Sequence, residues 1–293
     1  MTAAAALAKV NETELRKLSR AAQWLDIGQP AFGTGQRPHR TRPGQGAEFL
    51  DFRHYRPGED VRRMDWRVSA RRGKPFVRTY HDELSSDWVL CLDRSASMSL
   101  PDGGKWTLAV QMAAAFAYLL LNLGNRVALV TFSAHVDERV PLGRGRLQYL
   151  RIAAALRSSE AEAAGGGSSL AGTTSVLGPG MHLAIFSDFL RPDGMRSDLE
   201  FLRSPGRKIH AIQMLAASEA EVQDPGARSV RDIESGERVT LGPEARRNAH
   251  ERLRQTQNAL AAFSARNGIR FSSCAATDRW QDVILRHIAA AHG

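Results

Sequence analysis

Three side chains with oxygen atoms stand at alternate positions after an apolar run, about a third of the way along the chain. Asp93, Ser95 and Ser97 follow the strand-like sequence WVLCL. One carboxylate with several hydroxyls suits Mg²⁺, a hard cation that prefers oxygen ligands and keeps water molecules. The same aspartate could instead be a nucleophile, and Asp93 and Ser95 are both good N-caps for a following helix. The three residues by themselves leave these alternatives open.

Two further features favour a metal site. A second aspartate, Asp188, ends another apolar run, LAIFSD. A loop rich in Gly, Ser and Thr, AGGGSSLAGTTS, lies just before that run and supplies more hydroxyls. In parallel sheets, ligands bind at the carboxyl ends of strands, near the point where the strand order reverses. The ends of these two strands are therefore where we expect the chemistry.

Strand-like and helix-like segments alternate regularly from Asp87 onward, and they would position these residues. Apolar strand segments are expected at 87–93, 125–133, 181–188, 207–215 and 269–276, an antiparallel edge strand at 135–142, and a hairpin at 227–241. Helical segments are expected at 105–123, 146–159, 196–204, 244–268 and 280–291. The alternation predicts an α/β fold, a doubly wound, mostly parallel sheet of about six strands with helices on both faces.

The chain divides into three parts by composition. Residues 1–43 contain a helical segment at 11–25 and then an irregular connector rich in Gly, Pro and Arg. Residues 44–86 suggest short strands without enough length for a core of their own, so we expect them to pack on the main domain. Residues 87–293 would form that α/β domain.

Positive charge is concentrated in one segment. Residues 37–78 contain twelve Lys or Arg and five Asp or Glu, so they carry +7 of the net charge of +9. Such a segment suits nucleic acid, an anionic membrane or an acidic protein surface. It matches no nucleic-acid-binding module and has few aromatic residues arranged for stacking on bases. We expect internal ion pairs in this segment, with a partner-binding surface as the alternative, and we expect Trp66 and Tyr55 to be core residues. Nucleic-acid binding is retained only as an alternative function.

Cysteines and apolar segments indicate the compartment. Cys91 and Cys274 lie in apolar, strand-like runs and are expected to be reduced core thiols, as in cytosolic proteins. The N-terminus shows no basic region ahead of a long apolar segment, so no secretory signal is expected. The most apolar stretch starts at Thr107 and is interrupted at Gly124 after about 17 residues, short of the ~20 that span a bilayer. We expect a soluble, cytoplasmic chain without membrane insertion.

The pattern of Asp93, Ser95 and Ser97, written D-x-S-x-S, resembles the metal-ion-dependent adhesion site of von Willebrand factor type A domains. The resemblance implies a Rossmann-like fold in which the two serine oxygens bind the metal directly and the aspartate often acts through water. It also implies that the strand-end Asp188 belongs to the site. The expected ion is Mg²⁺, with Mn²⁺ or Ca²⁺ as alternatives.

One motif of that resemblance departs from the family pattern. The third motif is normally a threonine in a Gly-rich loop, and in this chain the matching position holds Ser168. Ser168 is expected to be the ligand, and Ser169, Thr173 and Thr174 are nearby rivals for the same place.

The segment before Asp87 resembles the signature of a bacterial family known as domain of unknown function 58. The matching positions are Gly44, Gly46, Glu48, Phe49, Arg53, Tyr55, Pro57, Gly58, Asp60, Arg62, Asp65, Trp66, Ala70 and Arg71. The likeness covers about residues 40–285. Many members carry two N-terminal membrane helices, which this chain lacks, so it resembles the short soluble class.

The family resemblance implies a non-enzymatic role beside MoxR-type AAA+ ATPases. The chain would recruit or assemble client proteins through its metal site, and an acidic side chain of a partner protein would complete the metal shell. It has no G-x-x-x-x-G-K-[ST] loop, Gly104-Lys105 being a near miss followed by tryptophan, so ATP would be hydrolysed by the partner.

Two alternatives come from other classes of function. A magnesium-dependent phosphotransferase or phosphatase would use Asp93 as its nucleophile. Enzymes of the haloacid dehalogenase type place a second aspartate two residues later as general acid, and Ser95 occupies that position here. A basic nucleic-acid-binding protein is the other alternative.

Overall fold

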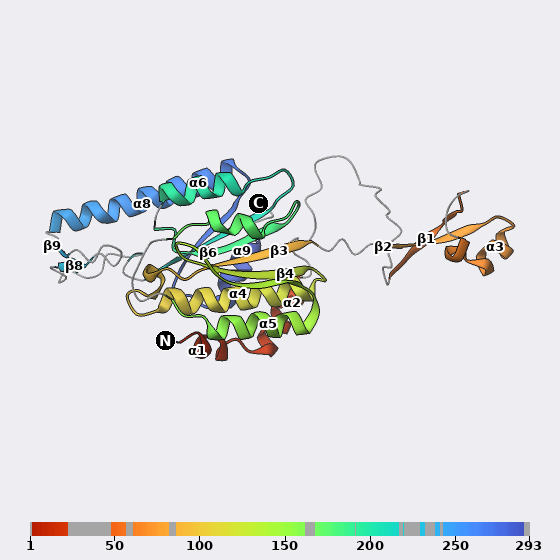
Figure 1. Ribbon diagram of the computed structural model, residues 1–293, viewed down its shortest axis with the longest axis horizontal. Coiled ribbons are helices and arrows are strands. Elements are labelled where there is room, and N and C mark those ends of the chain that lie inside the picture. The colour runs from red at the N-terminus through yellow and green to blue at the C-terminus, as the bar shows by residue number, and fades with distance from the viewer. Residues whose placement is uncertain are drawn as a thin grey trace. The chain divides into compact units, whose positions relative to one another are not determined.

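The computed structural model describes residues 2–22, 48–56, 61–81, 86–161, 168–190, 192–216, 219, 229–231, 238–240 and 243–289. The chain forms two compact units. The larger unit contains Met1–Gln29 and Ser85–Gly293, and the smaller contains Pro30–Leu84. Figure 1 shows the elements of each unit.

The strands are β1 (Glu48–His54), β2 (Phe76–His81), β3 (Asp87–Asp93), β4 (Arg126–Phe132), β5 (Val136–Gly143), β6 (His182–Ser187), β7 (Ile209–Leu215), β8 (Ser229–Arg231), β9 (Arg238–Thr240) and β10 (Arg270–Ala275). The α-helices are α1 (Ala3–Ala8), α2 (Glu12–Ala22), α3 (Trp66–Arg72), α4 (Gly104–Asn122), α5 (Gly145–Ser158), α6 (Pro192–Leu202), α8 (Pro243–Arg266) and α9 (Trp280–Ala289). Three short 3₁₀ helices are η1 (Val61–Arg63), η2 (Ala96–Ser99) and η3 (Ala171–Val176).

The larger unit is built on a six-stranded sheet with the order β10-β7-β6-β3-β4-β5. All neighbouring strands are parallel except β5, which pairs antiparallel with β4 at the edge. The predicted α/β fold with a mostly parallel sheet is confirmed, including the antiparallel edge strand. The hairpin predicted at 227–241 is the antiparallel pair β8-β9, and the residues that connect its two strands lie outside the described residues.

Alternate residues of each strand point to opposite sides of the sheet, so the apolar strands form a core on each face, and helices cover both. In β3, Trp88, Leu90 and Leu92 join the core beneath α1, α2, α4, α5 and α9. Val89 and Cys91 join the core beneath α6, α8 and the η3 segment. Cys91 and Cys274 are buried free thiols, as expected.

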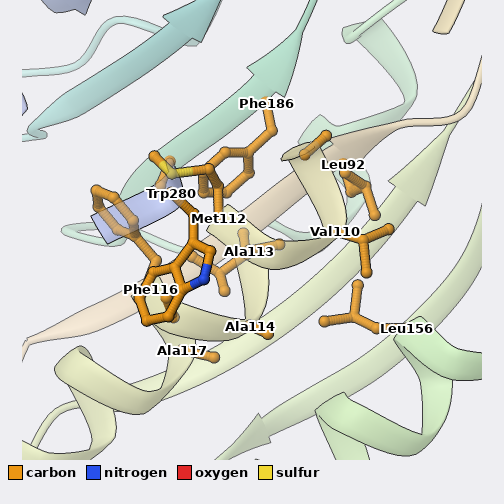
Figure 2. Close-up of a cluster of buried hydrophobic side chains, with 14 of the residues drawn as sticks. Leu92, Val110, Met112, Ala113, Ala114, Phe116, Ala117, Leu156, Phe186 and Trp280 are labelled. Carbon is orange, nitrogen blue, oxygen red and sulfur yellow. The ribbon is translucent and has the colours of Figure 1, made fainter. Parts of the chain in front are cut away.

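Helix α4 lies at the centre of the first core. Its sequence is rich in Ala and Leu, which are strong helix formers. Figure 2 shows Met112 and Phe116 of α4 beside Phe186 of β6 and Trp280 of α9. The rings of Phe116 and Phe186 meet edge to face with their centroids 5.5 Å apart. The most apolar 18-residue window of α4 is 89% buried inside the protein.

The N-terminal helices belong to the larger unit, which differs from the expected division that set residues 1–43 apart. Buried residues of α1 and α2, including Ala6 and Leu15, join the core around α4. The amide of Gln111 in α4 donates a hydrogen bond to the carbonyl of Ala6 over 3.1 Å. The expected helix at 11–25 corresponds to α2, and the connector that follows it lies outside the described residues.

The smaller unit contains the antiparallel pair β1-β2 and helix α3. Asp65 caps α3, because its Oδ1 accepts hydrogen bonds from the backbone N–H groups of Arg67 and Val68 over 3.0 and 3.1 Å. Tyr55 is half-buried, but the side chain of Trp66 is 67% exposed. The expectation that Trp66 is a core residue is wrong, because the first position of this short helix faces outward.

Two buried histidines form a hydrogen-bonded pair in the main core. His287 Nε2 lies 3.0 Å from His210 Nδ1, and His287 Nδ1 lies 2.7 Å from Ser272 Oγ. Burial lowers the pKa of His287 to about 3, with a further contribution from Arg270. Burial and the neighbouring His287 hold the pKa of His210 well below its ordinary value. His182 is also buried.

We predict that this pair makes the fold sensitive to acid. Below the ordinary histidine pKa of 6.5 the unfolded chain takes up protons that the folded pair excludes, so stability falls as pH drops. Between pH about 7.5 and about 5.5 the loss should be about 1 kcal/mol per histidine. Urea unfolding at the two pH values measures it, and His287→Gln should show the smaller loss. An equal loss in both proteins would contradict the prediction.

Candidate metal centre

The two strand-end aspartates lie at the same edge of the sheet. Asp93 is the last residue of β3, and Asp188 directly follows β6, the strand that pairs with β3. The chain proceeds from β3 to β4 on one side and places β6 and β7 on the other, so the strand order reverses at this point. Open α/β sheets bind their ligands at such a position.

Asp93 is fully buried, and serine groups surround its carboxylate. Its Oδ2 accepts hydrogen bonds from Ser187 Oγ over 2.6 Å and from Ser168 Oγ over 2.8 Å. Its Oδ1 accepts one from the backbone N–H of Ser95 over 2.9 Å. Three separate segments of the chain therefore converge on one carboxylate.

Ser95 and Ser97 lie next to each other, with 3.2 Å between their Oγ atoms. Ser95 stands at the N-cap position of η2, but its side chain makes no capping hydrogen bond there. The next long helix, α4, begins only at Gly104, after Gly103. The hydrogen bond from the backbone N–H of Ser95 to Asp93 belongs to a local turn. The hydroxyl of Ser95 does not cap a helix, so it is available with that of Ser97 for another partner.

The structure brings Ser168 to Asp93 and turns its rivals elsewhere. Thr173 Oγ1 is buried and donates to the carbonyl of Leu170 over 2.6 Å, and Thr174 Oγ1 donates to the carbonyl of Ala171 over 2.7 Å. Ser169 Oγ lies 3.4 Å from a carboxylate oxygen of Asp198.

Two backbone contacts hold this loop against the sheet. The N–H of Ser169 donates to the carbonyl of Ser133 over 2.9 Å, just beyond β4. The N–H of Leu170 donates to Asp198 Oδ2 over 2.7 Å, so α6 also fixes the loop. The position of Ser168 therefore depends on elements from both sides of β3.

Ser187 is a site residue that the sequence reasoning missed. It ends β6 directly before Asp188, and besides its bond to Asp93 its Oγ accepts a hydrogen bond from the N–H of Phe189 over 3.0 Å. Phe189 is buried with a backbone φ of +52°, a left-handed conformation that bulky residues rarely adopt. Such strain is found at functional sites. The signal in the sequence was the hydroxyl next to the predicted aspartate.

Asp188 faces a lysine that the sequence reasoning did not place in the site. Lys105 Nζ donates to Asp188 Oδ2 over 2.9 Å and to Glu219 Oε1 over 2.8 Å. The side chain of Lys105 has no exposed area. Burial lowers the pKa of Lys105, but the charges of Asp188 and Glu219 outweigh it, so that pKa lies above its ordinary value.

The carboxyl group of Asp93 is destabilised in its charged form. Burial raises its pKa to about 6, the negative charge of Asp188 adds to this, and the hydrogen bonds from Ser187 and Ser95 oppose it. Among the residues that the structure describes, no Lys, Arg or His forms an ion pair with Asp93. A cation beside Asp93 would therefore relieve an unfavourable charge.

The donor set fits a hard divalent cation. The described part of the chain holds no cluster of three or more His, Cys, Asp or Glu, so a transition-metal site of that kind is absent from it. The hydroxyl of Ser168 contacts the carboxylate of Asp93, and the hydroxyls of Ser95 and Ser97 lie beside each other in the turn that follows it. Carboxylate and hydroxyl oxygens are ligands that Mg²⁺, Mn²⁺ and Ca²⁺ accept. Asp188 adds a second carboxylate, partly engaged by Lys105.

We predict that Asp93→Asn stabilises the metal-free protein. The carboxyl pKa of about 6 lies above its ordinary 3.8, so the wild type loses stability as pH rises from about 4 to about 6, by about 3 kcal/mol in all. Urea unfolding in EDTA at pH about 8 should therefore show the variant about 1–3 kcal/mol more stable, with a smaller difference at pH about 5. A less stable variant at pH 8 would show that the carboxylate serves the fold itself.

Comparison with solved structures gives distant likenesses. BatB from Bacteroides thetaiotaomicron, a conserved hypothetical protein, matches with 15% identity and a TM-score of 0.43 over 70% of this chain and 98% of its own. An aerotolerance-related membrane protein from Bacteroides fragilis matches with 13% identity and a TM-score of 0.45 over 70% of this chain and 100% of its own. A membrane spanning protein from Vibrio fischeri matches with 14% identity and a TM-score of 0.26 over 71% and 100%.

The expected cytoplasmic location is contradicted and is not retained. Two of these solved structures are described as membrane proteins. Helix α4, with 19 residues, is also long and apolar enough to cross a membrane by length and composition. The helix begins at Gly104, before the stretch counted from Thr107, and 89% of its most apolar window is buried inside the protein.

Sequence relatives identify the family. Uncharacterised proteins from Mycobacterium bovis and from two strains of Mycobacterium tuberculosis are each 33% identical over 201 residues, which is 66% of this chain. The match covers 63% of the length of those relatives. Residues 51–260 match the model of the family described as protein of unknown function DUF58. The chain therefore belongs to the DUF58 family, which is the family that its upstream signature resembles.

Proposed function

We propose that this chain is a non-enzymatic adaptor that binds an acidic side chain of a partner protein through a divalent cation at Asp93. The cation is Mg²⁺, with Mn²⁺ or Ca²⁺ as alternatives. The adaptor works beside a MoxR-type AAA+ ATPase in the recruitment, assembly or maturation of client proteins. The observation that carries the proposal is the buried carboxylate of Asp93 among serine hydroxyls at the point where the strand order reverses.

The composition of the centre suits reversible docking. Hydroxyl ligands from Ser95, Ser97 and Ser168 carry no formal charge, so a cation held by them and by Asp93 keeps excess positive charge. Bound there, the cation would supply a coordination position that attracts a carboxylate from outside. The chain's own residues hold and orient the ion, and the partner completes its shell.

The surroundings of Asp93 support binding over nucleophilic catalysis. Both carboxylate oxygens already accept hydrogen bonds, and Oδ2 accepts two. The residue two positions later is Ser95, whose hydroxyl is a poor proton donor to a leaving group. The partnership with a MoxR-type ATPase is supported by the family resemblance alone.

We predict that binding to the partner depends on the metal centre. Surface-immobilised chain should capture the purified MoxR-type ATPase of the same organism in Mg²⁺ and lose at least about tenfold in affinity in EDTA, as a loss of about 1.4 kcal/mol implies. Asp93→Ala should lose as much in Mg²⁺, because the one uncompensated carboxylate is gone. Ser168→Ala should also bind the ATPase more weakly than the wild type in Mg²⁺.

Ser169→Ala is the matched control for the loop. It removes a hydroxyl one position away that faces Asp198, so it should bind the ATPase as the wild type does. Binding that ignores both EDTA and Asp93→Ala would contradict metal-dependent docking. Turnover of a generic phosphoester that Asp93→Asn abolishes would favour a phosphotransferase or phosphatase. Salt-dependent binding of nucleic acid that EDTA does not change would favour a nucleic-acid-binding protein.

A further inference from the structure

A buried ion triad lies at the edge of the candidate metal centre. Lys105, in the first turn of α4, holds Asp188 over 2.9 Å and Glu219 over 2.8 Å. The side chains of Lys105 and Asp188 are 0% and 3% exposed, and that of Glu219 is 22% exposed. Glu219 is fixed in turn, because its Oε2 accepts a hydrogen bond from the N–H of Ala216 after β7. The ammonium is thus shared between one acid of the centre and one acid outside it.

This sharing sets the charge that the centre presents to a cation. Asp188 is a candidate metal-site acid, but the ammonium of Lys105 neutralises much of its charge at close range. The serine hydroxyls contribute no charge, so Asp93 is left as the main uncompensated group. A lysine beside a cation site also repels the cation directly. Both effects oppose binding of a divalent ion by the chain alone.

We propose that Lys105 is a specificity-determining residue that keeps the affinity of the centre for a free divalent cation low, so that tight binding requires a carboxylate from outside. The inference rests on the proposed metal-dependent docking and adds the residue that makes it conditional. Glu219 tunes the effect, since it draws part of the ammonium's charge away from Asp188.

A purely mechanical role for Lys105 gives a different expectation. As a tether, Lys105 would only fix the start of α4 to Asp188 and to the segment after β7. Removing a tether would loosen the site and weaken the binding of every ligand. Removing a repelling charge strengthens cation binding. The sign of the change therefore separates the two roles.

The test is a titration of the whole chain with Mn²⁺ alone, followed by electron paramagnetic resonance at constant pH and without added carboxylates. Lys105→Met should bind Mn²⁺ about tenfold or more tightly than the wild type. Glu219→Gln should bind it a few-fold more weakly, because the undivided ammonium then faces Asp188. Asp87→Asn is the matched control: it also removes one acid, but at the opposite end of β3, about 20 Å away, and should bind as the wild type does.

The outcomes separate this inference from the function on which it rests. If the wild type binds Mn²⁺ and Lys105→Met binds it equally or more weakly, the role of Lys105 is overturned and the metal centre still stands. If Glu219→Gln binds Mn²⁺ as Asp87→Asn does, the tuning by Glu219 is overturned. Failure of all four proteins to bind Mn²⁺ overturns both. If Lys105→Met does not fold, Lys105→Gln takes its place, because it also removes the charge but keeps a polar side chain beside Asp188 and Glu219. Tighter Mn²⁺ binding than in the wild type is again the expected result, and equal or weaker binding overturns the role of Lys105.

Discussion

The carboxylate of Asp93, held away from water at the end of β3, is the constraint on which the site depends. A buried charge needs hydrogen bonds or a counter-charge, or it takes up a proton. The chain supplies hydrogen bonds from Ser95 after β3, from Ser187 at the end of the neighbouring strand β6, and from Ser168 in a loop held by contacts with Ser133 and Asp198. These bonds do not fully compensate burial, since the pKa still rises to about 6. The fold therefore leaves a partly uncompensated negative charge at Asp93 that a divalent cation would neutralise.

Two neighbours of Asp188 show that this edge is not optimised for stability. Phe189 holds a left-handed backbone conformation, and Lys105 is buried in a position where an apolar side chain would avoid desolvation. The rest of the unit offsets these costs through a sheet covered on both faces and an α4 buried almost all round. A rigid scaffold with a strained, charged edge is typical of a site that binds a ligand.

The sequence predicted the sheet well, because long apolar runs separated by helix-period segments determine an α/β fold. It also predicted that Asp93 and Asp188 lie at one edge, since carboxyl ends of parallel strands lie together. Ser168 was assigned to the site through the resemblance to the adhesion-site motif. Contacts set by tertiary packing were not predictable. These are the hydrogen bond from the Ser187 hydroxyl to Asp93 and the ion pair between Glu219 and Lys105, which are far apart in the sequence. Lys105 stood out only as an isolated lysine at the start of an apolar helix, and buried lysines are nearly always paired. Trp66 was misjudged because aromatic character alone does not tell which face of a short helix is covered.

The most direct test of the central claim is the anomalous diffraction of crystals of this chain soaked in Mn²⁺. If the metal centre exists, an anomalous peak for Mn²⁺ should lie between Asp93, Ser95, Ser97 and Ser168. The hydroxyls of Ser95 and Ser97 should point toward it, and the Lys105–Asp188 pair should lie at its side. The absence of a peak at high Mn²⁺, with Ser168 and Ser187 still bonded to Asp93, would contradict it. That result would make the buried carboxylate a structural group and leave the edge of the sheet without a metal centre.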